Sequence, residues 1–264
     1  MNRTIALLTD FGLTDPYVGQ MKGVLAKHAP NSPVIDLSHG VEPFCITQGA
    51  FYLWSALNHF PQDTVFVAVI DPGVGTNRRI IGCELGSRVI IAPDNGLVEL
   101  AEYLSPEAMI VTDLSSLAAR KAASATFHGR DIFAPIAAAV STGEQLSLMG
   151  SKLPLRDVAR TGISRPVWME NGVEAIVLHR DRFGNLILNI RDNHVLPERV
   201  VLPENPPRYP DSRIVRRAAC YAELQPRTTG LIIGSQGFYE LAVNKGSAAQ
   251  ELSLGPGDSV TFTW

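Results

Sequence analysis

The order of helix-like and strand-like runs is the feature that most constrains the fold of this chain. Over the first 160 residues, short apolar runs typical of strands alternate with longer runs that have the spacing of amphipathic helices. The strand-like runs are Thr4–Leu8, Val34–Leu37, Thr64–Ile70, Ile80–Glu84 and Arg88–Ala92. The helix-like runs are Val18–His28, Ile46–Asn58 and the run beginning at Ile132–Val140. This alternation predicts an α/β domain, a mostly parallel sheet with helices on both faces.

The pattern changes after Pro154, where the chain becomes polar and irregular. We therefore expect an α/β domain over residues 1–155, a linker over 156–170 and a β-rich domain over 171–264. The strands expected in the second domain are Glu174–Leu178, Leu186–Ile190, Gly230–Ile233, Tyr239–Val243 and Ser259–Thr263.

Composition excludes several classes of protein. With 264 residues, the chain can bury a core without disulfides or metal ions. A net charge of −3 offers no basic surface to nucleic acid or to anionic membranes. No apolar run approaches the ~20 residues of a membrane span, and the first residues lack the apolar core of a signal peptide. Three widely spaced cysteines support neither a disulfide framework nor a zinc site, so we expect a cytoplasmic protein.

Carboxylates, imidazoles and glycines gather in four clusters, most of them directly after predicted strands. The clusters are Thr9–Gly12, Asp71–Thr76, Pro93–Gly96 and Phe127–Asp131. Ligands of open α/β sheets bind at the carboxyl ends of the strands. Glycine lets a ligand approach the backbone closely. These clusters are therefore the candidate functional segments.

The clusters match no common nucleotide or metal motif. Arg78 stands where a dinucleotide-binding loop has its third glycine, and the chain has no Walker lysine and no H-E-x-x-H. A metal at His128 with Asp131, or at Asp10 with Asp71, stays open without a characteristic ligand spacing. Structural roles also stay open: a turn cap for Asp10, a turn for Asp71, a surface cation for Arg78 and a core histidine for His128.

Taken in order, these segments resemble the S-adenosyl-L-methionine (SAM) hydroxide adenosyltransferases, the adenosyl-forming SAM hydrolases related to fluorinase and chlorinase. The matching segments are Thr9–Gly12, Asp36–His39, Asp71–Thr76, Pro93–Leu97, Phe127–Asp131, Asp181–Asn185 and Ser235–Gly237. The resemblance implies hydrolysis of SAM to adenosine and L-methionine by attack of an activated water on ribose C5′, with no cofactor and no metal. It also implies a homotrimer in which SAM lies between the first domain of one subunit and the second domain of the next.

The same resemblance assigns the catalytic residues Asp71, Arg78 and His128. Asp71 would accept a proton from the water, and His128 would hold or relay that proton. Arg78 would keep Asp71 ionised and oriented. The halogenases have tyrosine at the position of Asp71 and an extra loop after it, so Asp71 favours water over halide as the nucleophile.

The expected substrate-binding residues are Asp10, Phe44, Asp181, Phe183, Asn185, Ser235 and Gln236. A carboxylate can accept both hydroxyls of a ribose diol, which suits Asp10. Asp181 suits the methionine ammonium and Ser235 the carboxylate, while the amide of Asn185 can read the adenine edge.

Phe44 and Phe183 suit the faces of the ribose or adenine, although both also fit simple core packing. Gln236 replaces a basic residue of the halogenases, so recognition of the substrate carboxylate can differ here. Two other functions stay open, a halide-using adenosyl transferase and a non-catalytic regulator that binds SAM or adenosine. Without the family resemblance, the motifs are also compatible with a metal-dependent phosphoesterase.

Overall fold

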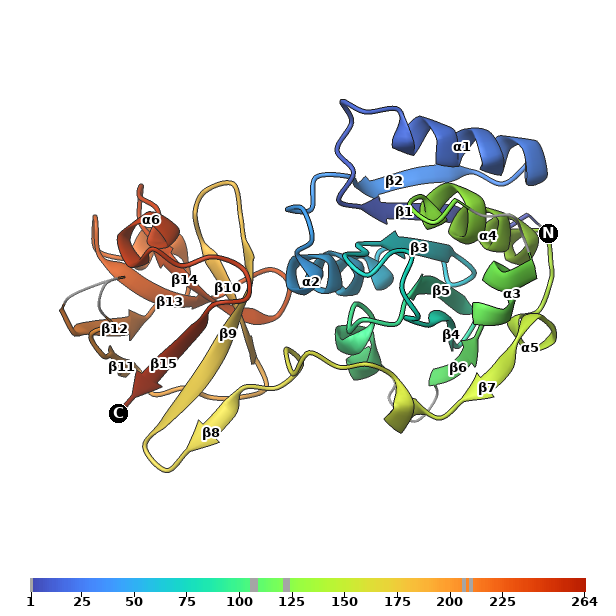
Figure 1. The fold of residues 1–264 in the computed structure, drawn as a ribbon. Coiled ribbons are helices and arrows are strands. Elements are labelled where there is room, and N and C mark those ends of the chain that lie inside the picture. The colour runs from blue at the N-terminus through green and yellow to red at the C-terminus, as the bar shows by residue number, and fades with distance from the viewer. Residues whose placement is uncertain (1, 105–108, 121–123, 206–207, 209–210) are drawn as a thin grey trace. The chain divides into compact units, whose positions relative to one another are not determined.

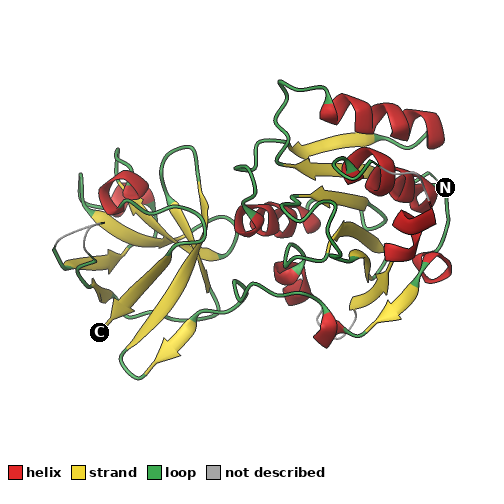
Figure 2. Ribbon diagram, viewed as in Figure 1, coloured by secondary structure: helices red, strands yellow, loops and turns green. Residues whose placement is uncertain are grey.

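A computed structural model describes residues 2–104, 109–120, 124–205, 208 and 211–264. The chain divides into two compact units, residues 1–161 and 162–264 (Figure 1). Helices are concentrated in the first unit and strands in the second, as Figure 2 shows. Among the described residues, no helix has the length and apolarity that crossing a bilayer would require.

The first unit is built on a seven-stranded sheet in the order β2-β1-β3-β5-β4-β6-β7. Its strands are β1 (Ile5–Thr9), β2 (Val34–Ser38), β3 (Val65–Val69), β4 (Ile80–Leu85), β5 (Arg88–Pro93), β6 (Met109–Asp113) and β7 (Ser151–Leu153). Strands β2, β1, β3 and β5 are parallel, whereas β4, β6 and β7 join antiparallel.

The expectation of a mostly parallel sheet is therefore wrong, and the sheet is mixed. The reason lies in the connection between β4 and β5, which is only Gly86 and Ser87 long. Two residues can join antiparallel neighbours, but a parallel pair needs a crossover of a dozen residues or more. Gly86 supplies the positive φ of 65° that such a turn requires.

Helices cover both faces of this sheet. They are α1 (Tyr17–His28), α2 (Ile46–Leu57), α3 (Ser115–Arg120), α4 (Ala134–Ser141) and α5 (Leu146–Met149), with 3-10 turns at Glu99–Leu104 and Leu155–Asp157 and a π-helical turn at Gly129–Phe133. Alternate strand residues such as Ile5 and Val67 form one core with α1 and α4. The intervening residues, such as Leu8 and Phe66, are also buried and point to the other face, against which α2 packs.

The second unit is a closed barrel of seven strands. Its elements are β8 (Val167–Met169), β9 (Gly172–Arg180), β10 (Leu186–Arg191), β11 (Arg199–Leu202), β12 (Arg213–Arg217), a 3-10 turn at Tyr221–Glu223, β13 (Thr229–Ile233), β14 (Phe238–Val243), α6 (Ala248–Leu252) and β15 (Ser259–Thr263). The order β10-β14-β13-β12-β11-β15-β9 closes through the β9–β10 pairing, and β8 adds to the outside of β9. The strand-rich character predicted for this part of the chain is confirmed.

Gly172 offers a test of the barrel, because it pairs with Thr263 where β9 meets β15. A Cβ atom at this position would lie 2.4 Å from the carbonyl oxygen of Phe262. Gly172→Ala therefore has to displace one of the two strands, and we expect it to lower the free energy of unfolding by about 1–3 kcal/mol.

Denaturation followed by tryptophan fluorescence measures this effect, since Trp168 and Trp264 both belong to the second unit. Gly255→Ala is the matched control, because nothing lies within 4 Å of a Cβ added there. Equal transition midpoints for the two variants would contradict the barrel packing.

Candidate active site

Asp71 lies at the carboxyl end of β3, the strand between β1 and β5. The carbonyl of the preceding Ile70 accepts a hydrogen bond of 2.9 Å from Nδ2 of Asn95. The following loop is closed by Thr76, whose hydroxyl donates to the carbonyl of Gly73 at 2.7 Å and accepts the N–H of Arg78 at 3.3 Å. These contacts return the chain so that Arg78 faces Asp71.

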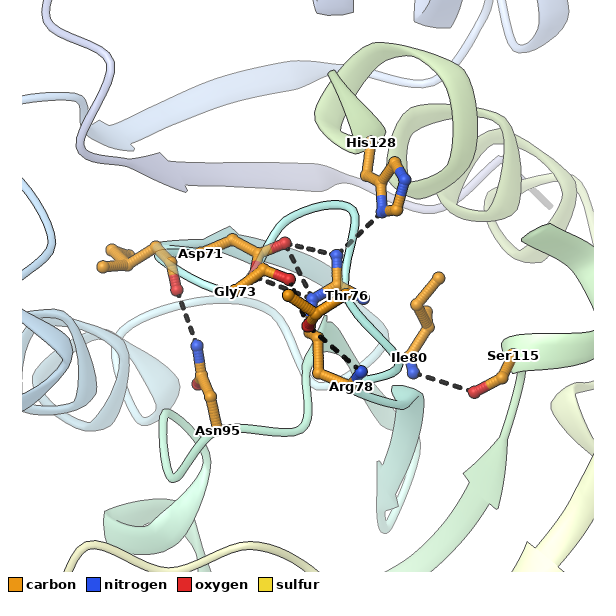
Figure 3. A network of polar contacts seen from close by, with 9 residues as sticks. Asp71, Gly73, Thr76, Arg78, Ile80, Asn95, Ser115 and His128 are labelled. Atoms are coloured by element: carbon orange, nitrogen blue, oxygen red, sulfur yellow. Dashed lines mark hydrogen bonds and ion pairs between the residues drawn. The ribbon is translucent and has the colours of Figure 1, made fainter. Parts of the chain in front are cut away.

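Arg78 binds Asp71 and His128 at the same time (Figure 3). Its Nε lies 2.7 Å from Oδ1 and 2.9 Å from Oδ2 of Asp71, and its Nη2 also donates to Oδ2. The same Nη2 lies 2.9 Å from Nδ1 of His128, which stands just before the π-helical turn. The side chains of Asp71 and Arg78 are only 5% and 9% exposed. The structure thus brings the three expected catalytic residues together.

The contact with Arg78 determines the protonation of His128. A guanidinium group only donates hydrogen bonds, so Nδ1 of His128 is the acceptor and the ring proton lies on Nε2. Burial lowers the pKa of His128, and the charge of Arg78 lowers it further, against the opposing effect of Asp71 and Asp131. His128 is therefore a neutral imidazole at pH 7.

A cavity of about 300 Å³ opens beside these groups. Its lining consists of Phe11, Tyr17, Val69, Asp71, Val74, Thr126, Phe127, His128 and Gly129. The Phe127 ring packs edge-to-face on Phe11 and Tyr17, with centroid distances of 5.8 Å and 5.1 Å. A carboxylate and a neutral imidazole thus face a small, largely apolar space, in which charges interact more strongly than in water.

Asp10 follows β1 and holds Phe44 in a strained conformation. Its Oδ2 accepts the N–H of Phe44 at 2.8 Å. Phe44 has a φ of 67°, which costs a residue with a side chain roughly 1–2 kcal/mol, and the residue is 70% exposed. Burial raises the pKa of Asp10, the N–H of Phe44 opposes that shift, and the charge of Asp71 adds to it. An exposed aromatic residue thus lies beside a carboxylate.

In the second unit, Asp181 organises the turn between β9 and β10. Its Oδ1 accepts the N–H groups of Phe183 and Asn185, each at 2.8 Å, and its Oδ2 accepts Nδ2 of Asn185 at 2.8 Å. A carboxylate offers about four lone-pair sites, more than these three contacts use. Phe183 is 78% exposed.

This turn borders a second cavity of about 670 Å³. Its lining consists of Asp181, Phe183, Asn185, Tyr221, Val243, Asn244, Lys245, Gly246, Ser247 and Gln250. Ser235 and Gln236 lie instead in the turn between β13 and β14, Ser235 exposed and Gln236 half-buried, and neither is in the described lining of the two cavities.

Sequence reasoning missed Tyr221, which connects this cavity to the barrel. Its hydroxyl donates to Oε2 of Glu240 at 2.8 Å and lies 3.4 Å from Nδ2 of Asn185. Glu240 is buried on β14. Tyr221 is an isolated aromatic residue in a segment without periodicity, so the sequence carried no signal for it.

Comparison with known proteins identifies relatives over nearly the whole chain. The SAM hydroxide adenosyltransferase N-terminal domain matches residues 5–150, and the C-terminal domain of the same name matches residues 175–261. The (R)-S-adenosyl-L-methionine hydrolase of Thermus thermophilus is 37% identical over 262 residues, which cover 97% of each chain. The fluorinase of Actinopolyspora mzabensis is 28% identical over 301 residues, covering 98% of this chain and 96% of its own. The crystal structure of an uncharacterized conserved protein from Thermotoga maritima superposes with a TM-score of 0.84 at 31% identity, over 99% of this chain and 100% of that one.

The protonation of His128 can be tested directly by NMR titration. We expect its pKa to lie below the ordinary 6.5, with the proton on Nε2. Arg78→Met removes a positive charge that disfavours the imidazolium, so the pKa of His128 should rise. Arg156→Met, which alters an arginine 86% exposed, should leave it unchanged. A pKa of His128 that does not respond to Arg78→Met would show that the two groups are not coupled.

Proposed function

The chain belongs to the SAM hydroxide adenosyltransferase family and hydrolyses SAM to adenosine and L-methionine, and we propose that Asp71, Arg78 and His128 activate the attacking water. The contacts of Arg78 carry this proposal, because one guanidinium orients both the carboxylate and the imidazole. Both groups line the small cavity, which is suited to a water molecule beside the reacting carbon.

The step of this reaction that needs catalysis is the activation of the attacking water. The water oxygen forms a bond to ribose C5′, the C5′–S bond breaks, and its electron pair stays on sulfur. Methionine leaves as a neutral thioether and needs no acid, whereas water is a weak nucleophile that must lose a proton. Asp71 takes this proton. Because the forming hydroxide and the sulfonium have opposite charges, the apolar lining of the cavity favours their reaction.

His128 has a narrower role than proton relay. Its Nδ1 already accepts a hydrogen bond from Arg78, so only the Nε2–H group is available for the water. A donor of this kind can hold the water oxygen through one lone pair while the other attacks. We therefore assign proton removal to Asp71 and positioning of the water to His128.

Substrate binding is divided between carboxylates and exposed rings. We propose that Asp10 accepts the ribose hydroxyls, and that Asp181, which orders its turn through three hydrogen bonds, receives the methionine ammonium. Asn185 reads the adenine edge. The exposed rings of Phe44 and Phe183 pack on the ribose or adenine faces, which covers apolar surface that otherwise meets water. Ser235 and Gln236 serve the substrate carboxylate.

Two observations favour water over halide. The small cavity is lined by the carboxylate of Asp71, a group that can accept a proton from water. The alignment with fluorinase runs over 301 residues, more than the 264 of this chain, so fluorinase has inserted residues that this chain lacks.

Among the described residues, no three histidine, cysteine or acidic side chains are grouped as metal ligands. We propose hydrolysis without a metal, since the leaving group requires no Lewis acid.

Incubation of the purified protein with SAM tests the reaction. Adenosine and methionine should form at the same rate with and without EDTA and chloride. A 5′-chloroadenosine product would support halide transfer, bound SAM without turnover would support a regulator, and loss of activity with EDTA would contradict metal independence.

Asp71→Asn tests the assignment of the base. We expect the rate of adenosine release to fall by roughly 10²–10⁴-fold, because the amide cannot take the proton, while the Kd for SAM changes little. Asp157→Asn, at a carboxylate 51% exposed, is the control for a general effect of lost charge. Wild-type turnover in Asp71→Asn, or in Asp71→Ala with SAM still bound, would show that another group is the base.

We also propose a homotrimer in which the first unit of one subunit and the second unit of the next share each substrate. Light scattering should give a mass near three times the 28.6 kDa of the chain. A mass near one chain, with full activity, would rule out a shared site.

We place the enzyme in the cytoplasm, which agrees with its three free thiols, Cys45, Cys83 and Cys220.

A further inference from the structure

The segment Asp36–His39 takes no part in the mechanism above, yet it contacts the turn that carries Asp10, a proposed substrate-binding residue. Strand β2 pairs in parallel with β1, with Leu7 opposite Asp36 and Leu8 opposite Ser38 (Figure 1). Both strands therefore end at the same edge of the sheet. His39, directly after β2, comes to lie beside Thr9, the last residue of β1.

A chain of polar contacts runs through His39 to the turn after β1. Lys22 Nζ lies 2.6 Å from Asp36 Oδ2, and Asp36 Oδ1 lies 3.1 Å from Nε2 of His39. On the other side of the ring, Nδ1 lies 2.8 Å from the hydroxyl of Thr9, which accepts the N–H of Phe11 at 3.2 Å. The His39 side chain is 2% exposed and Thr9 is fully buried. Lys22 and Asp36 are therefore partly exposed to solvent, whereas His39 and Thr9 are enclosed in the protein.

The backbone of His39 provides a second attachment. Its carbonyl accepts the N–H of Gly12 at 2.8 Å. Gly12 has a φ of 66°, so the chain reverses there in a conformation that suits glycine. His39 thus holds the turn at Thr9 and again at Gly12, and Asp10 lies between the two points.

The charges agree with one arrangement of protons. Burial acts to raise the pKa of Asp36, but the contacts with Lys22 and His39 outweigh it and lower that pKa. An ionised Asp36 favours the proton of His39 on Nε2, which leaves Nδ1 to accept the hydroxyl proton of Thr9. The Thr9 oxygen is then free to accept the N–H of Phe11. The Thr9 hydroxyl is thus held between the His39 ring and the N–H of Phe11, while Asp36 acts on His39 through its charge.

We propose that His39 is a positioning residue that holds Asp10 in the orientation needed to grip the ribose diol. This inference rests on the proposed role of Asp10 as the acceptor of that diol. Asp10 Oδ2 accepts the N–H of Phe44, and the backbone that carries Asp10 is the turn that His39 holds at Thr9 and at Gly12. The position of this turn therefore sets where the carboxylate can reach. A second group of this kind typically locks the geometry of the residue that touches the ligand.

A purely structural role for His39 makes a different prediction. Loss of stability or a distorted pocket would weaken every ligand alike. Loss of Asp10 positioning would weaken only ligands that carry the diol. The informative quantity is therefore the ratio of the Kd of 2′,3′-dideoxyadenosine to that of adenosine, since these ligands differ only in the two hydroxyls.

The experiment measures both Kd values by calorimetry on the intact protein. Asp10→Asn calibrates the ratio and should reduce it by about tenfold or more, as expected for lost hydrogen bonds to a charged acceptor. His39→Leu and Thr9→Val should reduce it several-fold, with the Kd of dideoxyadenosine unchanged. His39→Asn and Thr9→Ser retain an acceptor and a hydroxyl, respectively, and should restore much of the ratio.

Each outcome decides one question. If Asp10→Asn reduces the ratio but His39→Leu and Thr9→Val leave it at the wild-type value, His39 does not position Asp10. If both ligands weaken equally in those two variants, the role is structural and the inference also fails. If Asp10→Asn itself leaves the ratio unchanged, the proposed contact between Asp10 and the diol is wrong, independently of His39. Thr9→Val keeps the test possible where a His39 variant fails to fold.

Discussion

The candidate site of the first unit is arranged around the guanidinium of Arg78. Arg78 is 9% exposed, and its guanidinium holds a carboxylate from the loop after β3 and an imidazole from the start of the π-helical turn. A buried ion pair contributes little net stability, because desolvation offsets the attraction. Its effect is on geometry, since five rigid donors allow few arrangements of their acceptors. The nearby Phe133 ring, 5.6 Å from the guanidinium, adds a further contact on its apolar side.

This arrangement also explains why the surrounding loop is rich in small and polar residues. Arg78 reaches Asp71 only if the chain reverses within seven residues, which the Thr76 contacts accomplish. Gly75 has a φ of 79°, and a Cβ there would lie 2.5 Å from the carbonyl oxygen of Ala125. The loop is therefore closely packed against the segment that leads to His128. This contact fixes the position of the loop that carries Arg78 relative to the segment that carries His128.

Much of this could be predicted from residue patterns. The strand cores were evident because buried strands such as β3 are continuous apolar runs, and the polar clusters at their ends marked the site. Other features were not accessible in this way. Strands β6 and β8 each leave apolar residues exposed, so neither shows a clean alternation of buried and exposed positions. The hydrogen bonds of Tyr221 to Glu240 and of His39 to Thr9 join residues distant in sequence, which no local pattern encodes.

The closed barrel has a consequence for the turn that carries Asp181 and Asn185. In an open sheet, an edge strand can shift its register and disturb the hydrogen bonds to only one neighbouring strand. In a closed barrel of seven strands, a change of register between β9 and β10 requires compensating changes of register between other paired strands, because the barrel must still close. The strand pairings of the whole barrel therefore fix the relative position of the two strand ends that this turn joins. The substrate contacts proposed for Asp181 and Asn185 would therefore be made by a turn stiffer than a short turn is by itself.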